Sequence, residues 1–157
     1  MPNMIDNIVG IIGPYDRLAE LCYGAERNKF LQTVKPLSPS GEKHAMETWG
    51  VKWEIQNPLT YLHSNVGGYG HDWCLQLEFE SPWAPPIGAY QILEDEGCII
   101  EAHFMDTSGL DYGGSYCHGE YKSYPLDRLP EDIKTLFNET YDYERLTRFP
   151  DQPTKAA

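Results

Sequence analysis

Residues 72 to 80 constrain the fold of this chain most, because polar and apolar side chains alternate along them. A period of two is typical of a β-strand with one face on a core and the other in solvent. The apolar members are Trp73, Leu75, Leu77 and Phe79. We therefore expect a sheet with one covered face, and other segments must provide the cover.

Three segments have apolar residues at helical spacing and predict helices that cover such a sheet. They span residues 14 to 24, 86 to 96 and 129 to 146. Gly97 is expected to end the second helix, since glycine readily adopts the left-handed backbone that closes a helix. A short fourth helix is predicted between Ser40, as its N-terminal cap, and Gly50.

Further strands are predicted where short runs of apolar and β-branched residues lie between turn residues. They span residues 5 to 12, 30 to 34, 51 to 56, 99 to 105 and 114 to 121. Residues 57 to 70 contain Pro58 and several glycines, which predicts a loop or a wide hairpin connection. The glycine pair Gly113 and Gly114 is likewise assigned to a chain reversal.

The order of these elements favours an α+β fold, with a mostly antiparallel sheet and helices packed on one face. A chain of 157 residues has a common length for one domain. We therefore expect a single domain over residues 1 to 150 and a disordered tail over residues 151 to 157.

Four short segments carry a family resemblance. They are Met1-Pro2-Asn3, Trp49-Gly50-Val51-Lys52-Trp53, Phe79-Glu80-Ser81-Pro82-Trp83-Ala84-Pro85-Pro86, and Gly109-Leu110-Asp111-Tyr112-Gly113-Gly114. Together they resemble the YubB-like, ferredoxin-fold family encoded by phages and plasmids. The resemblance covers about residues 1 to 123 and implies a ferredoxin-like core and a place on mobile genetic elements. It implies no activity and no catalytic residue.

The charge of the chain is concentrated in one segment. Residues 53 to 121 contain 11 carboxylates and neither lysine nor arginine, while the whole chain has a net charge of −12. Such a segment repels phosphate backbones, so direct binding to nucleic acid is not expected. It is expected to face solvent, cations, or a basic surface that itself holds nucleic acid.

The leading functional hypothesis is an inhibitor of a host defence nucleoprotein complex, which mimics DNA by placing carboxylates in a basic nucleic-acid groove. The candidate partner-binding residues are Glu94, Asp95, Glu96, Glu101, Asp106, Asp111, Tyr112, Tyr116 and Glu120. The first three end a predicted helix, where the helix dipole disfavours carboxylates, and this cost favours a functional use. The two tyrosines are expected to be exposed aromatic anchors. The alternative is that the carboxylates of the acidic segment are only solvated and bind no partner.

Metal binding and catalysis are the alternatives to this hypothesis that the residue types suggest. His71, Cys74, Cys117 and His118 have side chains that suit zinc, and Glu78 with Glu80 share one strand face. Cys117 and His118, however, point to opposite faces of a strand, so no metal and no cofactor are expected. Pairs drawn from Cys98, Cys117, His103 and His118 lie in no nucleophile motif, so no catalytic residue is expected.

A metal-assisted hydrolase using residues 63 to 120 is the second hypothesis, and a structural or assembly accessory protein is the third.

The chain is expected to lie in the cytoplasm of the host cell, away from membranes. No apolar run approaches the roughly 18 residues of a membrane span, and the first residues do not form a secretion signal. The four cysteines are widely scattered, which fits reduced thiols better than a disulfide framework.

Overall fold

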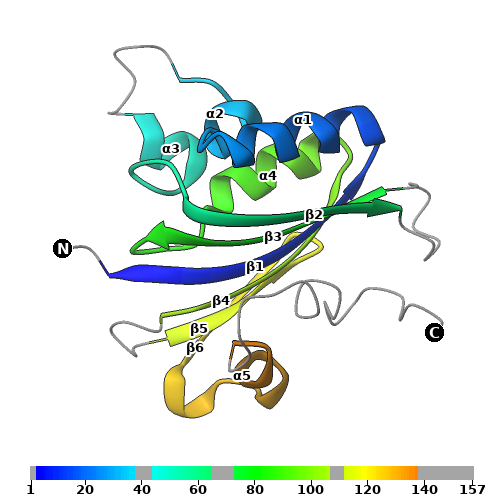
Figure 1. Cartoon of the computed structure of the whole chain (residues 1–157). Helices are drawn as coiled ribbons and strands as arrows, with labels where there is room; N and C mark the ends of the chain where they lie inside the picture. The colour runs from blue at the N-terminus through cyan, green and yellow to red at the C-terminus, as the bar shows by residue number, and fades with distance from the viewer. Residues whose placement is uncertain (1–2, 38–43, 65–72, 107–111, 138–157) are drawn as a thin grey trace.

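The computed structural model describes residues 3–37, 44–64, 73–106 and 112–137, which build a six-stranded sheet and its helices (Figure 1). The strands are β1 (Met4–Gly13), β2 (Gln56–Ser64), β3 (Trp73–Pro82), β4 (Ile99–Met105), β5 (Tyr112–Cys117) and β6 (Glu120–Pro125). The helices are α1 (Tyr15–Glu26), α2 (Phe30–Val34), α3 (Ala45–Trp49), α4 (Ile87–Asp95) and α5 (Glu131–Phe137), and a 3₁₀ turn, η2, spans Leu126–Arg128.

The strand order is β2-β3-β1-β4-β5-β6, and every pair of neighbours is antiparallel. β1 is a central strand, since it pairs along its whole length with β3 and over seven positions with β4. The expected α+β fold with a mostly antiparallel sheet is confirmed.

The main core lies between the sheet and helices α1 to α4, which all cover one face (Figure 1). Val9 and Ile11 of β1 project into it, and the alternating apolar residues of β3 project into it beside them. Tyr90, Phe30 and Phe79 are the largest of its side chains that are less than 2% exposed. This face is the covered face that the alternation in residues 72 to 80 predicts.

Helix α5 packs on the opposite face of the sheet, beside β4 (Figure 1). Its Leu136 contacts Ile8 of β1, and its Ile133 packs with Met105 and Leu129. The expectation that helices share one face therefore holds for α1 to α4 and fails for α5. The predicted continuation of this last helix, residues 138 to 146, lies outside the described residues, as does the expected tail.

The second face of β3 is buried, although the alternation predicts that it is exposed to solvent. Cys74, Gln76 and Glu78 on this face are at most 1% exposed. Glu101 and His103 of β4 lie on the same face, two strands away, and are also buried. The pattern of side chains identifies the polar face of a strand, but it carries no information about what covers that face.

Three predicted elements differ from the structure. The strand predicted over residues 114 to 121 is two strands, β5 and β6, which a turn at His118 and Gly119 separates. Residues 30 to 34 form helix α2 and not a strand, because the Glu54 carboxylate accepts the backbone N–H groups of Leu31 and Gln32 at 2.7 and 3.2 Å. β2 begins at Gln56, so it occupies much of the expected loop and little of the expected strand over 51 to 56. Pro58 is tolerated there because β2 is an edge strand, with a pairing irregularity between Gln56 and Leu59.

Tyr90 gives a test of packing in the main core. Its side chain is 0% exposed, its hydroxyl has no hydrogen-bond partner among the described residues, and burial raises its pKa well above the usual range. An unpaired buried hydroxyl costs about 1–3 kcal/mol, so Tyr90→Phe is expected to raise the free energy of unfolding by about 1 kcal/mol in urea denaturation.

Tyr116→Phe is the matched control for this substitution. The two rings pack with centroids 5.5 Å apart, but the Tyr116 hydroxyl donates to the Glu94 carboxylate. Its removal is expected to lower the free energy of unfolding by about 1 kcal/mol. A loss of stability in Tyr90→Phe equal to that in Tyr116→Phe would contradict the assignment of an unpaired hydroxyl.

Candidate functional site

Four of the candidate acidic residues gather at one end of the sheet, and we call them the acidic rim: Glu94, Asp95, Glu96 and Glu120. Gly97, with φ +100°, turns the chain from α4 into β4, as predicted for the residue that ends this helix. The carboxylate oxygens of Glu94 lie 3.9 Å from the point where a Cβ on Gly119 would stand. The end of α4 therefore lies beside the turn from β5 to β6, which Glu120 follows.

Glu96 has an intramolecular partner, contrary to the expectation for carboxylates at this helix end. The Arg17 guanidinium of α1 donates to both of its oxygens, at 2.8 and 3.0 Å. The same guanidinium also donates to the carbonyls of Thr33 and Val34. This network joins the beginning of α1, the end of α2 and the end of α4, so it gives Glu96 a structural role.

Tyr116 is 2% exposed, so the expectation that it is an exposed aromatic anchor is wrong. Its side chain lies on the helix side of the sheet within the main core, and its hydroxyl donates to Glu94. Burial and the neighbouring Glu94 carboxylate raise the pKa of Tyr116 above its usual range. The hydroxyl thus remains a donor and holds Glu94 in place.

Asp95, Glu96 and Glu120 are the exposed members of the acidic rim, and Arg17 holds both carboxylate oxygens of Glu96. Glu120 pairs with Lys122 at 3.6 Å, and both side chains of this pair are largely exposed. An exposed ion pair contributes at most about 1 kcal/mol, so a stronger cationic partner can displace Lys122. Asp95 and Glu120 are therefore the exposed rim carboxylates that Arg17 does not hold.

The remaining candidates do not join the acidic rim. Glu101 and Asp106 are 0% and 2% exposed, so the expectation that they face a partner is wrong. Glu101 lies 3.1 Å from Nε2 of His118 on the α5 side of the sheet. Tyr112 begins β5, at the end remote from the β5–β6 turn, and its hydroxyl donates to the Trp83 carbonyl at 2.9 Å. Asp111 lies outside the described residues.

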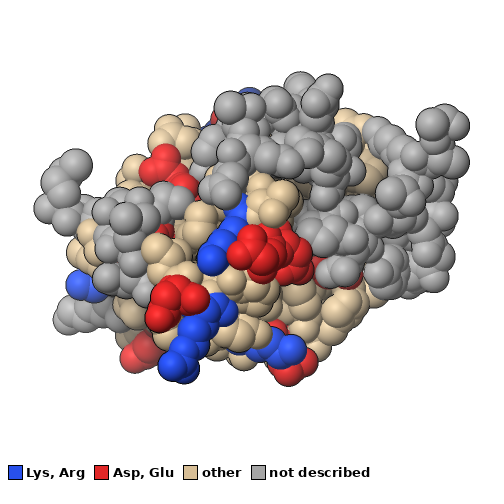
Figure 2. Space-filling view, turned by 90° about the horizontal axis from the view of Figure 1, so that it is seen from below, with Lys and Arg blue, Asp and Glu red and all other residues tan. Residues whose placement is uncertain are grey.

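Acidic and basic side chains are interspersed on the face that carries β6 and α5 (Figure 2). Ion pairs join Lys122 to Glu120 and Lys134 to Glu131 there. Both lysines come from outside the base-free segment of the sequence. The segment therefore does not build an uninterrupted acidic face on this side of the molecule.

The residues considered for a metal site are spread over the sheet. Cys74 on β3 and Cys117 on β5 are separated by β1 and β4, which places them roughly 14 Å apart, too far to bind one ion together. His71 lies outside the described residues. Within the described ranges, no three His, Cys, Asp or Glu side chains group to hold a metal ion.

The cysteines are free thiols. Burial raises the pKa of Cys98 to about 11, with a smaller contribution from the Glu96 carboxylate. The reactive thiolate form is therefore rare at neutral pH, which disfavours Cys98 as a nucleophile.

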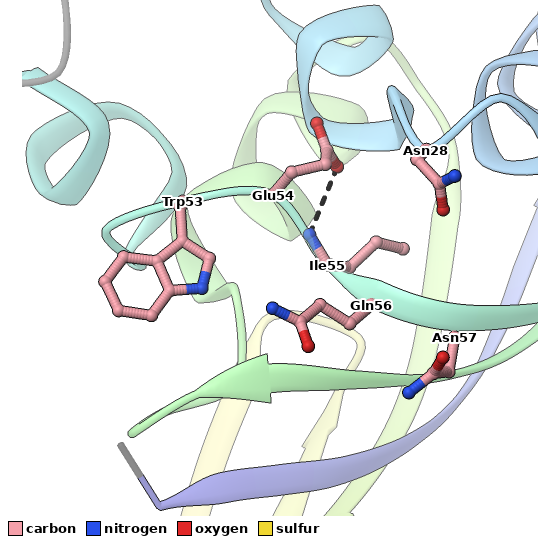
Figure 3. A pocket seen from close by; sticks show the side chains of 6 residues that line it. All are labelled: Asn28, Trp53, Glu54, Ile55, Gln56 and Asn57. Carbon is pink, nitrogen blue, oxygen red and sulfur yellow. Dashed lines mark hydrogen bonds between the residues drawn. The ribbon is translucent and has the colours of Figure 1, made fainter. Parts of the chain in front are cut away.

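A pocket lies at the other end of α1 from Arg17, and the sequence does not reveal it (Figure 3). It has a volume of about 360 Å³ and is lined by Asn28, Trp53, Glu54, Ile55, Gln56 and Asn57. Asn28 comes from the turn between α1 and α2, and the other five precede or begin β2. These residues have no periodic pattern, and the sequence analysis divides them between a strand and a loop.

Glu54 holds the backbone beside the pocket through hydrogen bonds, and its contribution to stability is expected to depend on pH. Its carboxylate accepts N–H groups from Leu31, Gln32 and Ile55, yet burial raises its pKa above the usual glutamate range. A carboxyl group whose pKa is higher in the folded than in the unfolded state stabilises the fold fully at pH values below its unfolded-state pKa, about 4.3 for glutamate. This stabilisation is lost as the pH rises through the folded-state pKa.

The unfolding free energy of the wild type, relative to Glu54→Gln, is therefore expected to fall as pH rises from about 4 to 7. Urea denaturation of both proteins at several pH values measures this difference. The comparison cancels the titration of groups that the two proteins share. A difference that stays constant or grows with pH would show that Glu54 is not the group with the raised pKa.

Comparison with protein-family models, with curated proteins and with solved structures gave no match to this chain. In the part of the chain that the structure describes, no helix is both long and apolar enough to cross a membrane.

Proposed function

We propose that this chain works by binding rather than by catalysis, and that the acidic rim is the surface that meets a basic partner. The observation that carries this proposal is the exposure of Asp95 and Glu120 beside two further carboxylates. Among the described residues, Arg17 and Lys122 are the cations paired with the rim, so negative charge is in excess. Such an excess speeds the encounter with a cationic surface.

The proposed partner is a host protein with a basic nucleic-acid-binding surface, within a defence complex that the chain would inhibit. The net charge of −12 supports this choice, since it repels nucleic acid itself and attracts proteins that hold nucleic acid. The resemblance of four segments to the YubB-like family supports a place on mobile genetic elements, where inhibition of host defence is useful.

We also propose a ferredoxin-like core for residues 4 to 105. The elements β1, α1, β2, β3, α4 and β4 follow the β-α-β-β-α-β order of that fold, with α2 and α3 inserted before β2. The sheet order β2-β3-β1-β4 supports the same assignment, because β1 and β3 are central and β2 and β4 flank them. β5 and β6 then extend the sheet beyond β4.

The test is a pull-down from nuclease-treated bacterial lysate with three tagged proteins. They are the wild type, the rim variant Asp95→Lys/Glu120→Lys, and the control variant Glu47→Lys/Glu131→Lys, which reverses two exposed acids elsewhere. Each reversal adds two positive charges, so both variants have a net charge of −8 instead of −12. The control therefore separates the position of the charges from their total.

Wild type and control are expected to retain a nucleic-acid-binding protein at low salt and to release it at high salt or to a competing DNA oligonucleotide. The rim variant is expected to retain at least about tenfold less, because two of the four rim carboxylates become repulsive. Equal retention by the rim and control variants would overturn the assignment to the rim. Retention that neither salt nor DNA reduces would overturn nucleic-acid mimicry.

A further inference from the structure

The pocket beside Trp53 combines one aromatic face with several neutral amides. Figure 3 shows Trp53 at one end, Asn28 and Asn57 at the other, and Gln56 extending from β2 towards the indole. The volume of about 360 Å³ falls within the range of small-molecule sites. A ligand here would rest on the indole and meet amide groups along its edge.

The charged groups at this pocket are already engaged. Both oxygens of Glu54 accept backbone N–H groups, and its side chain points towards α2 (Figure 3). Asn57 donates one amide hydrogen to the Glu80 carboxylate at 2.8 Å. None of the six described residues that line the pocket is a lysine or an arginine. An anionic ligand would meet two carboxylates and no cationic side chain among the lining residues, so phosphate-bearing ligands are disfavoured.

The neutral amides fit hydroxyl groups. Each amide side chain offers both an acceptor oxygen and N–H donors, and a hydroxyl group likewise donates and accepts. Asn28, Gln56 and Asn57 are all exposed, so their remaining donors and acceptors face solvent. A ligand with several hydroxyls on a small ring satisfies this set, whereas a purely apolar ligand would leave it unpaired.

Trp53 packs against a second tryptophan. The residue is 38% exposed, and its ring meets that of Trp83 at an interplanar angle of 65°, with centroids 5.3 Å apart. The Trp83 backbone is itself fixed, since its N–H donates to the Asn3 carbonyl at 2.8 Å and its carbonyl accepts from Tyr112. The ammonium of Lys52 lies 5.0 Å from the centre of the Trp83 ring. The contact with Trp83 thus restrains the indole of Trp53, which lines the pocket and stays partly exposed.

Asn28 and Asn57 have left-handed backbones, with φ +59° and +53°. Glycine adopts this region with the least strain, and asparagine is among the few other residues that tolerate it. At both positions the chain therefore carries an amide where the backbone alone would favour glycine. The amides of these two residues lie at the same end of the pocket (Figure 3).

We propose that this pocket binds a neutral sugar, with the C–H face of one pyranose ring on Trp53 and its hydroxyls on Asn28, Gln56 and Asn57. This site is separate from the acidic rim, because the two lie at opposite ends of α1. Sugar binding and partner binding are accordingly separable by mutation.

The test is titration of the full-length ¹⁵N-labelled protein with methyl glycosides of glucose, galactose, mannose and N-acetylglucosamine, followed by NMR shifts and tryptophan fluorescence. N-acetylneuraminic acid and adenosine serve as anionic and nucleoside comparisons. At least one neutral glycoside is expected to bind with a Kd of about 1 to 10 mM, which is typical of a single small contact surface. The largest shifts should fall on residues 53 to 57 and on Asn28.

Trp53→Ala is expected to weaken this binding at least about tenfold, and Tyr23→Ala, which removes an exposed aromatic ring elsewhere, is expected to leave it unchanged. Asn28→Gly and Asn57→Gly keep the left-handed backbone while removing an amide, so they are expected to weaken binding severalfold. Asn28→Gly is expected to leave thermal stability unchanged, whereas Asn57→Gly also removes the hydrogen bond to Glu80. The variant Asp95→Lys/Glu120→Lys should bind the sugar as the wild type does.

Binding of adenosine or N-acetylneuraminic acid without any neutral glycoside would overturn the proposal. The absence of shifts in the pocket with all four glycosides, or unchanged binding by Trp53→Ala, would overturn it as well. None of these results affects the acidic rim, since the rim is tested with a different variant and a different probe.

Discussion

Replacement of Gly114 by alanine is expected to lower the free energy of unfolding by about 3 kcal/mol or more. A Cβ at this position in β5 would stand 1.9 Å from the carbonyl oxygen of Lys122 and 2.9 Å from Cζ of Phe104. The first of these atoms is backbone in the neighbouring strand, so it moves only if β5 and β6 separate. Overpacking of this kind commonly costs about 1–3 kcal/mol, and a backbone obstacle places this site at the upper end.

Gly114 is also the place where the Phe104 ring crosses β5. Phe104 is 1% exposed and stacks on Tyr121 of β6, with centroids 5.7 Å apart and ring planes 7° apart. A methyl group at Gly114 would displace this ring and expose part of it. The substitution therefore disturbs both the pairing of the last two strands and the ring that covers them.

Chemical denaturation of the wild type, Gly114→Ala and Ser123→Ala measures this effect. Ser123 is the exposed cross-strand partner of Gly114, and its substitution is expected to change stability by no more than about 0.5 kcal/mol. A loss below about 1 kcal/mol in Gly114→Ala would mean that β6 yields easily. The close approach of β5 and β6 would then not contribute to the stability of the fold.

The same glycines show what sequence patterns resolve and what they miss. Gly113 and Gly114 are assigned from sequence to a chain reversal, with Gly114 also beginning a predicted strand, and both lie within β5. Because glycine has no side chain, atoms of neighbouring strands can approach these positions closely. The local sequence does not show that such space is required. By contrast, β1, β3, β4, α1 and α4 are found close to their observed bounds, because each has its own apolar pattern.

Long-range contacts account for the misassigned elements too. Phe30 to Val34 have strand-forming residues, yet the Glu54 carboxylate, 23 residues from Leu31, receives the first N–H groups of α2. Propensity is a weak guide to a five-residue segment, and one such tertiary contact overrides it. β2 was missed in turn because an edge strand tolerates a proline that would break a central one.

The candidate site is likewise predicted from the sequence only in part. The sequence locates the base-free acidic segment correctly, but Arg17 and Lys122 reach its carboxylates from outside that segment. Counting charges along the chain cannot detect such pairings. Burial removes Glu101, Asp106 and Tyr116 from any exposed surface, and the sequence gives the chemistry of these residues without their depth.

Phe79→Ala is the second substitution with a large expected effect, a loss of about 4 kcal/mol in the free energy of unfolding. Phe79 is 1% exposed in β3, and its ring centroid lies 6.1 Å from that of Phe30 in α2. Removal of a buried phenylalanine commonly costs about 3–5 kcal/mol, because it combines lost transfer free energy with a cavity. Met46→Ala, at an exposed site on α3, should cost about 0.5 kcal/mol or less.

A double-mutant cycle with Phe30→Ala separates the ring pair from general core loss. We expect the two losses to be non-additive by about 0.5–1.5 kcal/mol, because either substitution removes the same contact. Full additivity would mean that the two rings stabilise the fold independently. Since Phe30 begins the helix whose first N–H groups bind Glu54, a coupled pair would also connect the centre of β3 to the backbone that supports the pocket. In that case Phe79→Ala should weaken sugar binding without touching a pocket residue.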